Sequence, residues 1–161
     1  MNRKYFLKFC LTMLGGIPFF GTPKQAMAAT RIPRPLKEWD SQEFTFEENG
    51  RSYPGIAIKL PSSAGKDSSL IVACKICPHQ GCEFGFEKNF RAVGNIVGKE
   101  FENPMFFCRC HMSVFDPTQN GKVLNGPAPH PPWLFTYQAN DNEIEIQSIP
   151  PDVGIVETTN N

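Results

Sequence analysis

The chain has 161 residues, and its 16 basic and 16 acidic side chains cancel. This length corresponds to one domain, or to one domain with a targeting segment. Balanced charge gives no electrostatic basis for binding nucleic acid or an anionic membrane surface. The 15 prolines and 13 glycines favour a loop-rich, all-β chain over a helical one.

The first segment, residues 1–28, has the order of an export signal. A basic start precedes an apolar stretch over residues 9–20 and then an Ala-Met-Ala cleavage signal. The apolar stretch is shorter than the ~20 residues of a membrane-spanning helix; an uncleaved anchor is the alternative. Residues 2–8 also resemble a twin-arginine box in which Lys4 stands at the second arginine. We expect a mature chain that begins near Ala29.

The next segments predict an extended start and then β-strands. Residues 29–42 contain two prolines and are expected to form an extended lead-in. Residues 44–46 and 55–60 predict two strands joined by a turn at residues 48–50. The continuous apolar run over residues 70–74 is typical of a buried strand.

Two short loops carry side chains that could bind a metal. The first is Cys77-Pro78-His79-Gln80-Gly81-Cys82, and the second is Cys108-Arg109-Cys110-His111-Met112-Ser113. Each offers one cysteine and one histidine close together, which fits tetrahedral zinc or a [2Fe–2S] centre with two histidines on one iron. Zinc modules usually space their ligands more widely than Cys77 and His79. Cys74, which lies just before the first loop, is expected to be a packed core thiol.

The second half of the chain predicts further short strands. The insert 83–107 between the loops is rich in glycine and phenylalanine, and its sequence predicts no function. A hairpin turn is predicted at residues 119–121, and a flexible tail over residues 150–161. The segments expected to be strands are residues 105–107, 122–124, 133–137 and 143–147.

The two loops together, C-x-H-x-G-C followed by C-x-C-H-x-S, resemble those of Rieske proteins. The resemblance implies a [2Fe–2S] cluster in which the first cysteine and the histidine of each loop are ligands. It also implies a disulfide between Cys82 and Cys110. The implied fold is an antiparallel β-sandwich base with a small cluster-binding subdomain at its tip, over residues 43–149. The implied ligands are Cys77, His79, Cys108 and His111.

The surroundings of the implied cluster show one departure from this family. Gly126-Pro127-Ala128-Pro129 resembles the proline loop that covers the cluster in Rieske proteins of cytochrome bc and b6f complexes. Ser113 matches the serine that hydrogen-bonds a cluster sulfur. Phe115, however, stands where high-potential members have a tyrosine, so one hydrogen bond is missing and we expect a lower potential. His130 is interpreted as a loop histidine.

The resemblance implies one-electron transfer, with exposed histidines linking electrons to protons. A cluster assembled in the cytoplasm must cross the membrane inside a folded protein, which fits the twin-arginine route, and an exported compartment permits the disulfide. We therefore expect a periplasmic chain, associated with the membrane only through a partner or an uncleaved signal.

Two complexes fit this interpretation. The proline loop favours the Rieske subunit of a quinol–cytochrome c reductase, whose partners are cytochrome b and c subunits and quinol. The signal and Phe115 favour the small subunit of arsenite oxidase, whose partner is a molybdopterin subunit. The alternatives are a ferredoxin-type donor to an oxygenase and a structural zinc module. With three histidines, the chain cannot also hold the mononuclear iron of an oxygenase.

Overall fold

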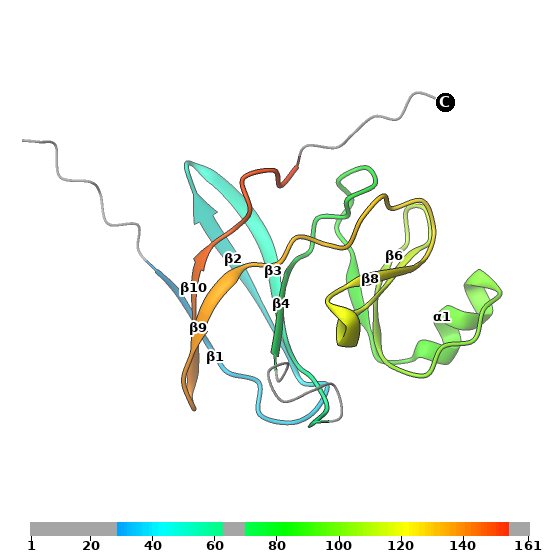
Figure 1. The fold of residues 1–161 in the computed structure, drawn as a ribbon, viewed down its shortest axis with the longest axis horizontal. Helices are drawn as coiled ribbons and strands as arrows, with labels where there is room; N and C mark the ends of the chain where they lie inside the picture. Colours follow the sequence, from blue (N-terminus) through cyan, green and yellow to red (C-terminus); the bar gives the residue numbers. More distant parts are fainter. Residues whose placement is uncertain (1–28, 63–69, 155–161) are drawn as a thin grey trace, which may run out of the picture.

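The computed structural model describes residues 29–62 and 70–154, which form three antiparallel sheets and one short helix (Figure 1). The predicted export signal and the end of the predicted tail lie outside the described residues. The first sheet has the strand order β1-β10-β9, the second β2-β3-β4 and the third β5-β6-β7-β8. Among the described residues, no helix has the length and apolar character needed to span a membrane.

Each expected strand overlaps a strand of the structure, although the one expected over residues 133–137 does so only in part. The sequence did not predict the strands over residues 30–33, 85–87 and 113–116, or the helix over residues 90–97. The first two sheets contain β1 (Thr30–Pro33), β2 (Ser41–Glu48), β3 (Arg51–Lys59), β4 (Leu70–Cys74), β9 (Thr136–Ala139) and β10 (Glu143–Ser148). The third sheet contains β5 (Gly85–Glu87), β6 (Met105–Cys108), β7 (Ser113–Asp116) and β8 (Lys122–Asn125). Helix α1 spans Phe90–Val97, and a 3-10 turn spans Pro117–Gln119.

Three apolar cores hold these elements in layers. The first core lies between the first and second sheets and includes Phe46 and Ile144. The second core lies between the second and third sheets and includes Ile58 and Phe106. The third core packs α1 against the far face of the third sheet through Val93. In Figure 1, α1 therefore lies at the opposite end of the molecule from β9 and β10.

Strand β4 explains the uninterrupted apolar run of the sequence, because it is buried on both faces. Side chains alternate across a strand. Val72 and Cys74 accordingly face the first core, while Ile71 and Ala73 face the second. The same strand delivers the first loop, so the core that stabilises the base also fixes the starting point of the candidate site.

The predicted hairpin between β2 and β3 is present. Its two central residues, Asn49 and Gly50, have φ of 53° and 74°. Two residues with positive φ make the turn type whose twist matches the flanking strands. The strands pair from Ser41↔Ile58 to Glu48↔Arg51.

The two ends of the described chain pack on the base. Within the expected lead-in, residues 30–33 form β1, which pairs with β10. Within the expected tail, Val153 is buried in the first core, and Trp133 Nε1 donates a hydrogen bond of 3.1 Å to Asp152. Both ends therefore contribute to the base up to Gly154.

Candidate metal centre

The first loop is a tight turn closed by its own backbone. Cys77 N donates a hydrogen bond of 2.7 Å to Cys82 O, and Gly81 N donates one of 2.9 Å to Cys77 O. Gly81 has φ of 74°, a conformation that residues with a Cβ adopt only at a cost. Cys77 and Cys82 are therefore held at the two ends of one compact turn.

The second loop connects β6 to β7 in the third sheet. Cys108 is the last residue of β6 and pairs with Ser113, the first residue of β7. The four residues between them turn the chain, and Met112 takes a positive φ of 60°. The strand pairing thus places Cys108 and Ser113 side by side at the base of the loop.

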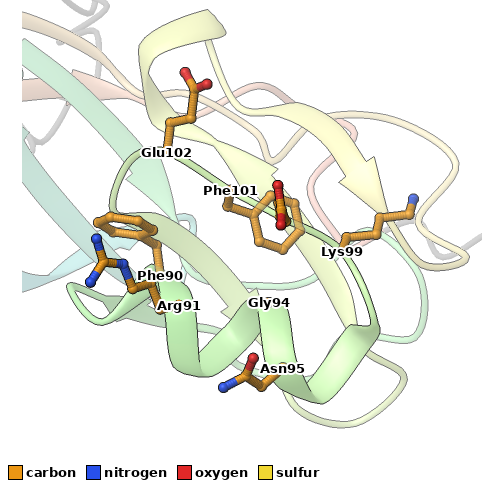
Figure 2. Close-up of a pocket in the computed structure, with 8 residues that line it drawn as sticks. Phe90, Arg91, Gly94, Asn95, Lys99, Phe101 and Glu102 are labelled. Atoms are coloured by element: carbon orange, nitrogen blue, oxygen red, sulfur yellow. The ribbon is translucent and has the colours of Figure 1, made fainter.

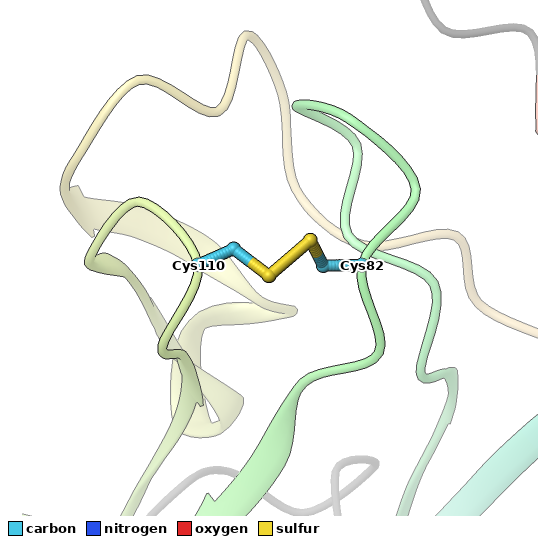
Figure 3. Close-up of a disulfide and its surroundings, with 2 residues drawn as sticks. All are labelled: Cys82 and Cys110. Atoms are coloured by element: carbon cyan, nitrogen blue, oxygen red, sulfur yellow. A yellow bond between two sulfur atoms is a disulfide. The ribbon is translucent and has the colours of Figure 1, made fainter.

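A disulfide between Cys82 and Cys110 joins the two loops (Figure 3). Its Cα atoms are 6.6 Å apart, although the residues are 28 positions apart in the chain. The structure therefore contains the pairing that the resemblance implied. The bridge holds the two loops face to face, with one histidine on each.

The two histidines meet between the loops. The rings of His79 and His111 have centroids 4.7 Å apart and planes at 85°. His111 is exposed, whereas His79 is partly buried. The Nδ1 atom of His79 is buried without a hydrogen-bond partner. A buried ring nitrogen without a partner is costly in a protein unless another group, such as a metal, occupies that direction.

The cysteine sulfurs of the two loops lie close to one another. Cys108 Sγ lies within 4.8 Å of both disulfide sulfurs. Cys77 and Cys108 are both buried, and their thiols are neighbours. Burial, with a smaller contribution from Cys108, raises the pKa of Cys77 to about 11, against the opposing effect of the His79 backbone N–H. A buried thiol with a raised pKa, such as that of Cys77, becomes a thiolate only beside a compensating cation.

The donor set fits a mixed cysteine and histidine metal centre. The disulfide sulfurs are already bonded to each other, so the free donors at the site are two thiols and two imidazoles. Ser113 Oγ is the other buried polar side-chain atom without a partner among the described residues. Its hydroxyl faces the Cys77 sulfur without reaching hydrogen-bond geometry. The two atoms without partners are what a site completed by a bound group would leave in this structure.

The sequence pattern that defines the Rieske [2Fe-2S] domain matches residues 41–150. The chain belongs to the Rieske [2Fe-2S] domain family. It is therefore a Rieske iron–sulfur protein, and membership of the family implies a [2Fe–2S] cluster and electron transfer.

Two solved structures are similar to this chain, and the first of them shows the same fold. A chain of a hyperthermophilic respiratory Complex III is 22% identical, with a TM-score of 0.50, over 76% of this chain and 80% of that chain. The plasma-membrane Rieske protein PetC3 from the cyanobacterium Synechocystis PCC 6803 is 24% identical, with a TM-score of 0.44, over 66% of this chain and 86% of that chain.

The proline loop, residues 126–129, packs directly on the second loop. A Cβ on Gly126 would lie 2.5 Å from Ser113 Cα and 2.7 Å from Met112 O, so no larger residue fits there. Pro127 is exposed next to it. Gly126 is thus needed for close contact between the two loops.

Phe115 lies beneath the second ligand loop in the second core. It is fully buried and packs against Phe84, which follows the first ligand loop. Cys74 is fully buried in the first core, in agreement with its interpretation as a core thiol. His130 contacts its near neighbours in the chain. Its Nδ1 lies 2.7 Å from Pro131 O, and its ring packs edge to face against Trp133.

Two ionic contacts that the sequence did not predict brace the loops. Lys75, buried at the end of β4, forms ion pairs with Glu43 at 2.8 Å and with Glu83 at 2.7 Å. Burial alone would lower the pKa of Lys75, but its hydrogen bonds to the two carboxylates outweigh this and raise it. The base, through β2, is therefore joined to the residue that follows Cys82.

The insert between the loops also supports the site. Its α1 begins at Asn89, whose side chain accepts from Ala92 N, and ends at Gly98 with φ of 70°. Asparagine before and glycine after a helix are sequence signals that could have predicted it. Glu87 in β5 pairs with Arg109 of the second loop at 2.7 Å.

A surface hollow of about 650 Å³ lies beside α1 (Figure 2). It is lined by Phe90, Arg91, Gly94, Asn95, Lys99, Glu100, Phe101 and Glu102. None of these residues belongs to the two ligand loops. This hollow is thus separate from the candidate metal centre.

Proposed function

We propose that this chain is an exported electron-transfer subunit of a respiratory oxidoreductase. The observation that carries the proposal is the meeting of His79 and His111 between two disulfide-linked loops, with centroids 4.7 Å apart. Cys77 and Cys108 would hold one iron of the cluster, and the two histidines would hold the other. A [2Fe–2S] cluster bound there would supply one-electron chemistry at a potential raised by its imidazole ligands.

The exposure of the side chains at the site indicates where electrons would enter and leave. His111 is exposed, so its second ring nitrogen is available to a quinol or to a partner cofactor. Both thiols are buried, so electrons would enter and leave through the histidine side. Ser113 Oγ, which has no other partner, would donate a hydrogen bond toward a sulfur of the site.

Two partner classes remain supported by particular residues. The tight contact of Gly126 with Met112 and Ser113 supports a covered site of the quinol–cytochrome c reductase type, with cytochrome b and c partners. Phe115, which has no hydroxyl to donate, supports the lower potential of the arsenite oxidase type, with a molybdopterin partner. Either class places the chain in the periplasm, in keeping with the basic, apolar and Ala-Met-Ala order of residues 1–28.

One preparation tests the proposal. The full-length chain, tagged at its C-terminus and purified from membranes of its own cells, should show the EPR signal of a reduced Rieske centre, whose average g-value is lower than that of a cluster with four cysteine ligands. Haem absorbance bands in the preparation would assign the reductase type, and molybdenum by elemental analysis would assign the arsenite oxidase type. A preparation with zinc and no such signal would overturn the proposal. A Rieske signal in the cytoplasmic fraction would overturn the export assignment alone.

A further inference from the structure

Met112 has an unusual backbone conformation directly after His111. Its φ of 60° lies in the left-handed region, which side-chain-bearing residues avoid. The residue is also partly exposed, with 40% of its surface accessible, so its own side chain is not packed tightly enough to impose this conformation. Such a conformation persists only where neighbouring groups hold it.

Asn125 supplies one of these neighbouring groups. Its Nδ2 donates a hydrogen bond of 2.9 Å to Met112 O. The contact depends on an irregularity in the strand pairing: Val114 pairs with Asn125, whereas the next residue, Phe115, pairs with Val123. The additional residue in β8 is a bulge, and bulges redirect side chains at the ends of strands.

Gly126 lies against the same peptide. The space that a Cβ on Gly126 would need is taken by Met112 O and by the backbone of Ser113. The Met112–Ser113 peptide is therefore contacted both by a side-chain donor and by a closely packed backbone. Of these two residues, only Asn125 acts through a side chain that can be replaced without closing this space.

We infer that Asn125 is a positioning residue for the second ligand loop. By holding Met112 in the left-handed conformation, it sets the direction of His111 on one side and of Ser113 on the other. The inference deepens the proposed function and rests on it, since it takes His111 as a ligand. Without the bond from Asn125, Met112 can relax toward negative φ, and this rotation moves both neighbours.

A double-mutant cycle tests this inference. The four proteins are the wild type, Asn125→Ala, Met112→Gly and the double variant, each prepared as full-length, cluster-loaded protein. Glycine adopts positive φ without the penalty of a side chain. If Asn125 serves to hold Met112, then Met112→Gly makes Asn125 dispensable. Asn95→Ala, an exposed asparagine on α1, is the matched control.

The readouts are the EPR g-values of the reduced protein, its midpoint potential against pH, and the half-life of cluster absorbance on warming. We expect Asn125→Ala to shift the g-values, lower the potential and shorten the half-life at least threefold. In the Met112→Gly background the same substitution should produce less than half of each effect. Asn95→Ala should change none of them.

Each outcome of the cycle either supports or overturns the positioning role of Asn125. Unchanged g-values and potential in Asn125→Ala overturn the inference, as do effects of equal size in both backgrounds. If Asn125→Ala fails to load a cluster, rescue by Met112→Gly supports the inference, and a lack of rescue overturns it. A wild-type protein without a Rieske signal would instead overturn the proposed function, so the two failures are distinguishable.

Discussion

Phe115 packs against Phe84, with ring centroids 5.6 Å apart and planes tilted by 44°. Phe115 follows the second ligand loop and Phe84 follows the first, so the contact joins the two loops from beneath. Both rings are buried in the second core together with Cys77 and Cys108. A hydroxyl at position 115 would therefore be added within the buried core that also contains the proposed cysteine ligands.

We expect Phe115→Tyr to raise the midpoint potential by some tens of millivolts. A hydroxyl that donates to a cysteine sulfur stabilises the reduced state, because reduction adds negative charge to the acceptor. Hydrogen bonds to charged groups contribute about 1.5–3 kcal/mol, of which only the part that differs between redox states moves the potential. Protein-film voltammetry measures the shift, starting from a wild-type value within the Rieske range of roughly −150 to +300 mV.

Ser113→Ala is the matched comparison, because it removes the hydroxyl that the chain already has. It should lower the potential, opposite in sign to Phe115→Tyr. An unmoved or lowered potential in Phe115→Tyr, in a structure whose new hydroxyl points at Cys77 or Cys108, would contradict this account of tuning.

Replacing either histidine should remove the cluster. His79→Ala or His111→Ala leaves one iron without a ligand, so we expect loss of colour and of the EPR signal. Cys74→Ser is the control: it changes a cysteine near the first loop that faces the first core, and it should keep both. Loss in Cys74→Ser together with retention in His111→Ala would overturn the ligand assignment.

Removing the disulfide should weaken the cluster without preventing its assembly. Cys82→Ser leaves all four proposed ligands but frees the two loops from each other. The loss of a native disulfide typically costs about 2–5 kcal/mol. We expect a cluster that forms and is then lost on mild heating, followed by absorbance. Cys110→Ser should behave alike, since either change breaks the same bond. Intact-mass analysis of the wild type that finds both thiols free would contradict the bridge.

Lys75→Met should lower the melting temperature of the loaded protein. The ammonium group is buried, while Glu43 and Glu83 expose 64% and 57% of their side chains, so water screens much of the attraction. We expect a loss of about 1 kcal/mol, which corresponds to a few degrees for a domain of this size. Lys88→Met, at an exposed lysine of the insert, should change the melting temperature much less. Equal effects would show that the ion pairs add no stability.

The Cys74 thiol should make the fold less stable in alkali. Burial raises the pKa of Cys74 from 9.0 to about 11. The pKa of this thiol is higher in the folded chain than in the unfolded chain. The stability that the protonated thiol contributes is therefore fully present below pH 9.0 and is lost as the pH rises toward 11. Two pKa units correspond to roughly 2–3 kcal/mol.

Melting temperatures between pH 8 and 11 measure this effect. The wild type should fall more steeply than Cys74→Ala over this range, because the variant has no thiol to ionise at that position. Parallel curves would show that the buried thiol does not ionise on unfolding in this range.

The sequence by itself determined the parts of this protein that depend on neighbouring residues. The loop motifs around Cys77 and Cys108, the buried strand over residues 70–74 and the turn at Asn49-Gly50 are local patterns, in which residue type and spacing are sufficient. The Asn89 and Gly98 capping signals of α1 belong to the same class, although they were not used to predict the helix.

Only the tertiary structure decided which distant groups meet. Four contacts join residues that are 8 to 32 positions apart in the chain. They are the two ion pairs of Lys75, the ion pair of Glu87 with Arg109, and the hydrogen bond from Asn125 to Met112. Strand register and one bulge bring Asn125 to its partner, and register depends on how whole sheets bury their apolar faces. No local pattern contains that information, because it arises from the packing of the three cores together.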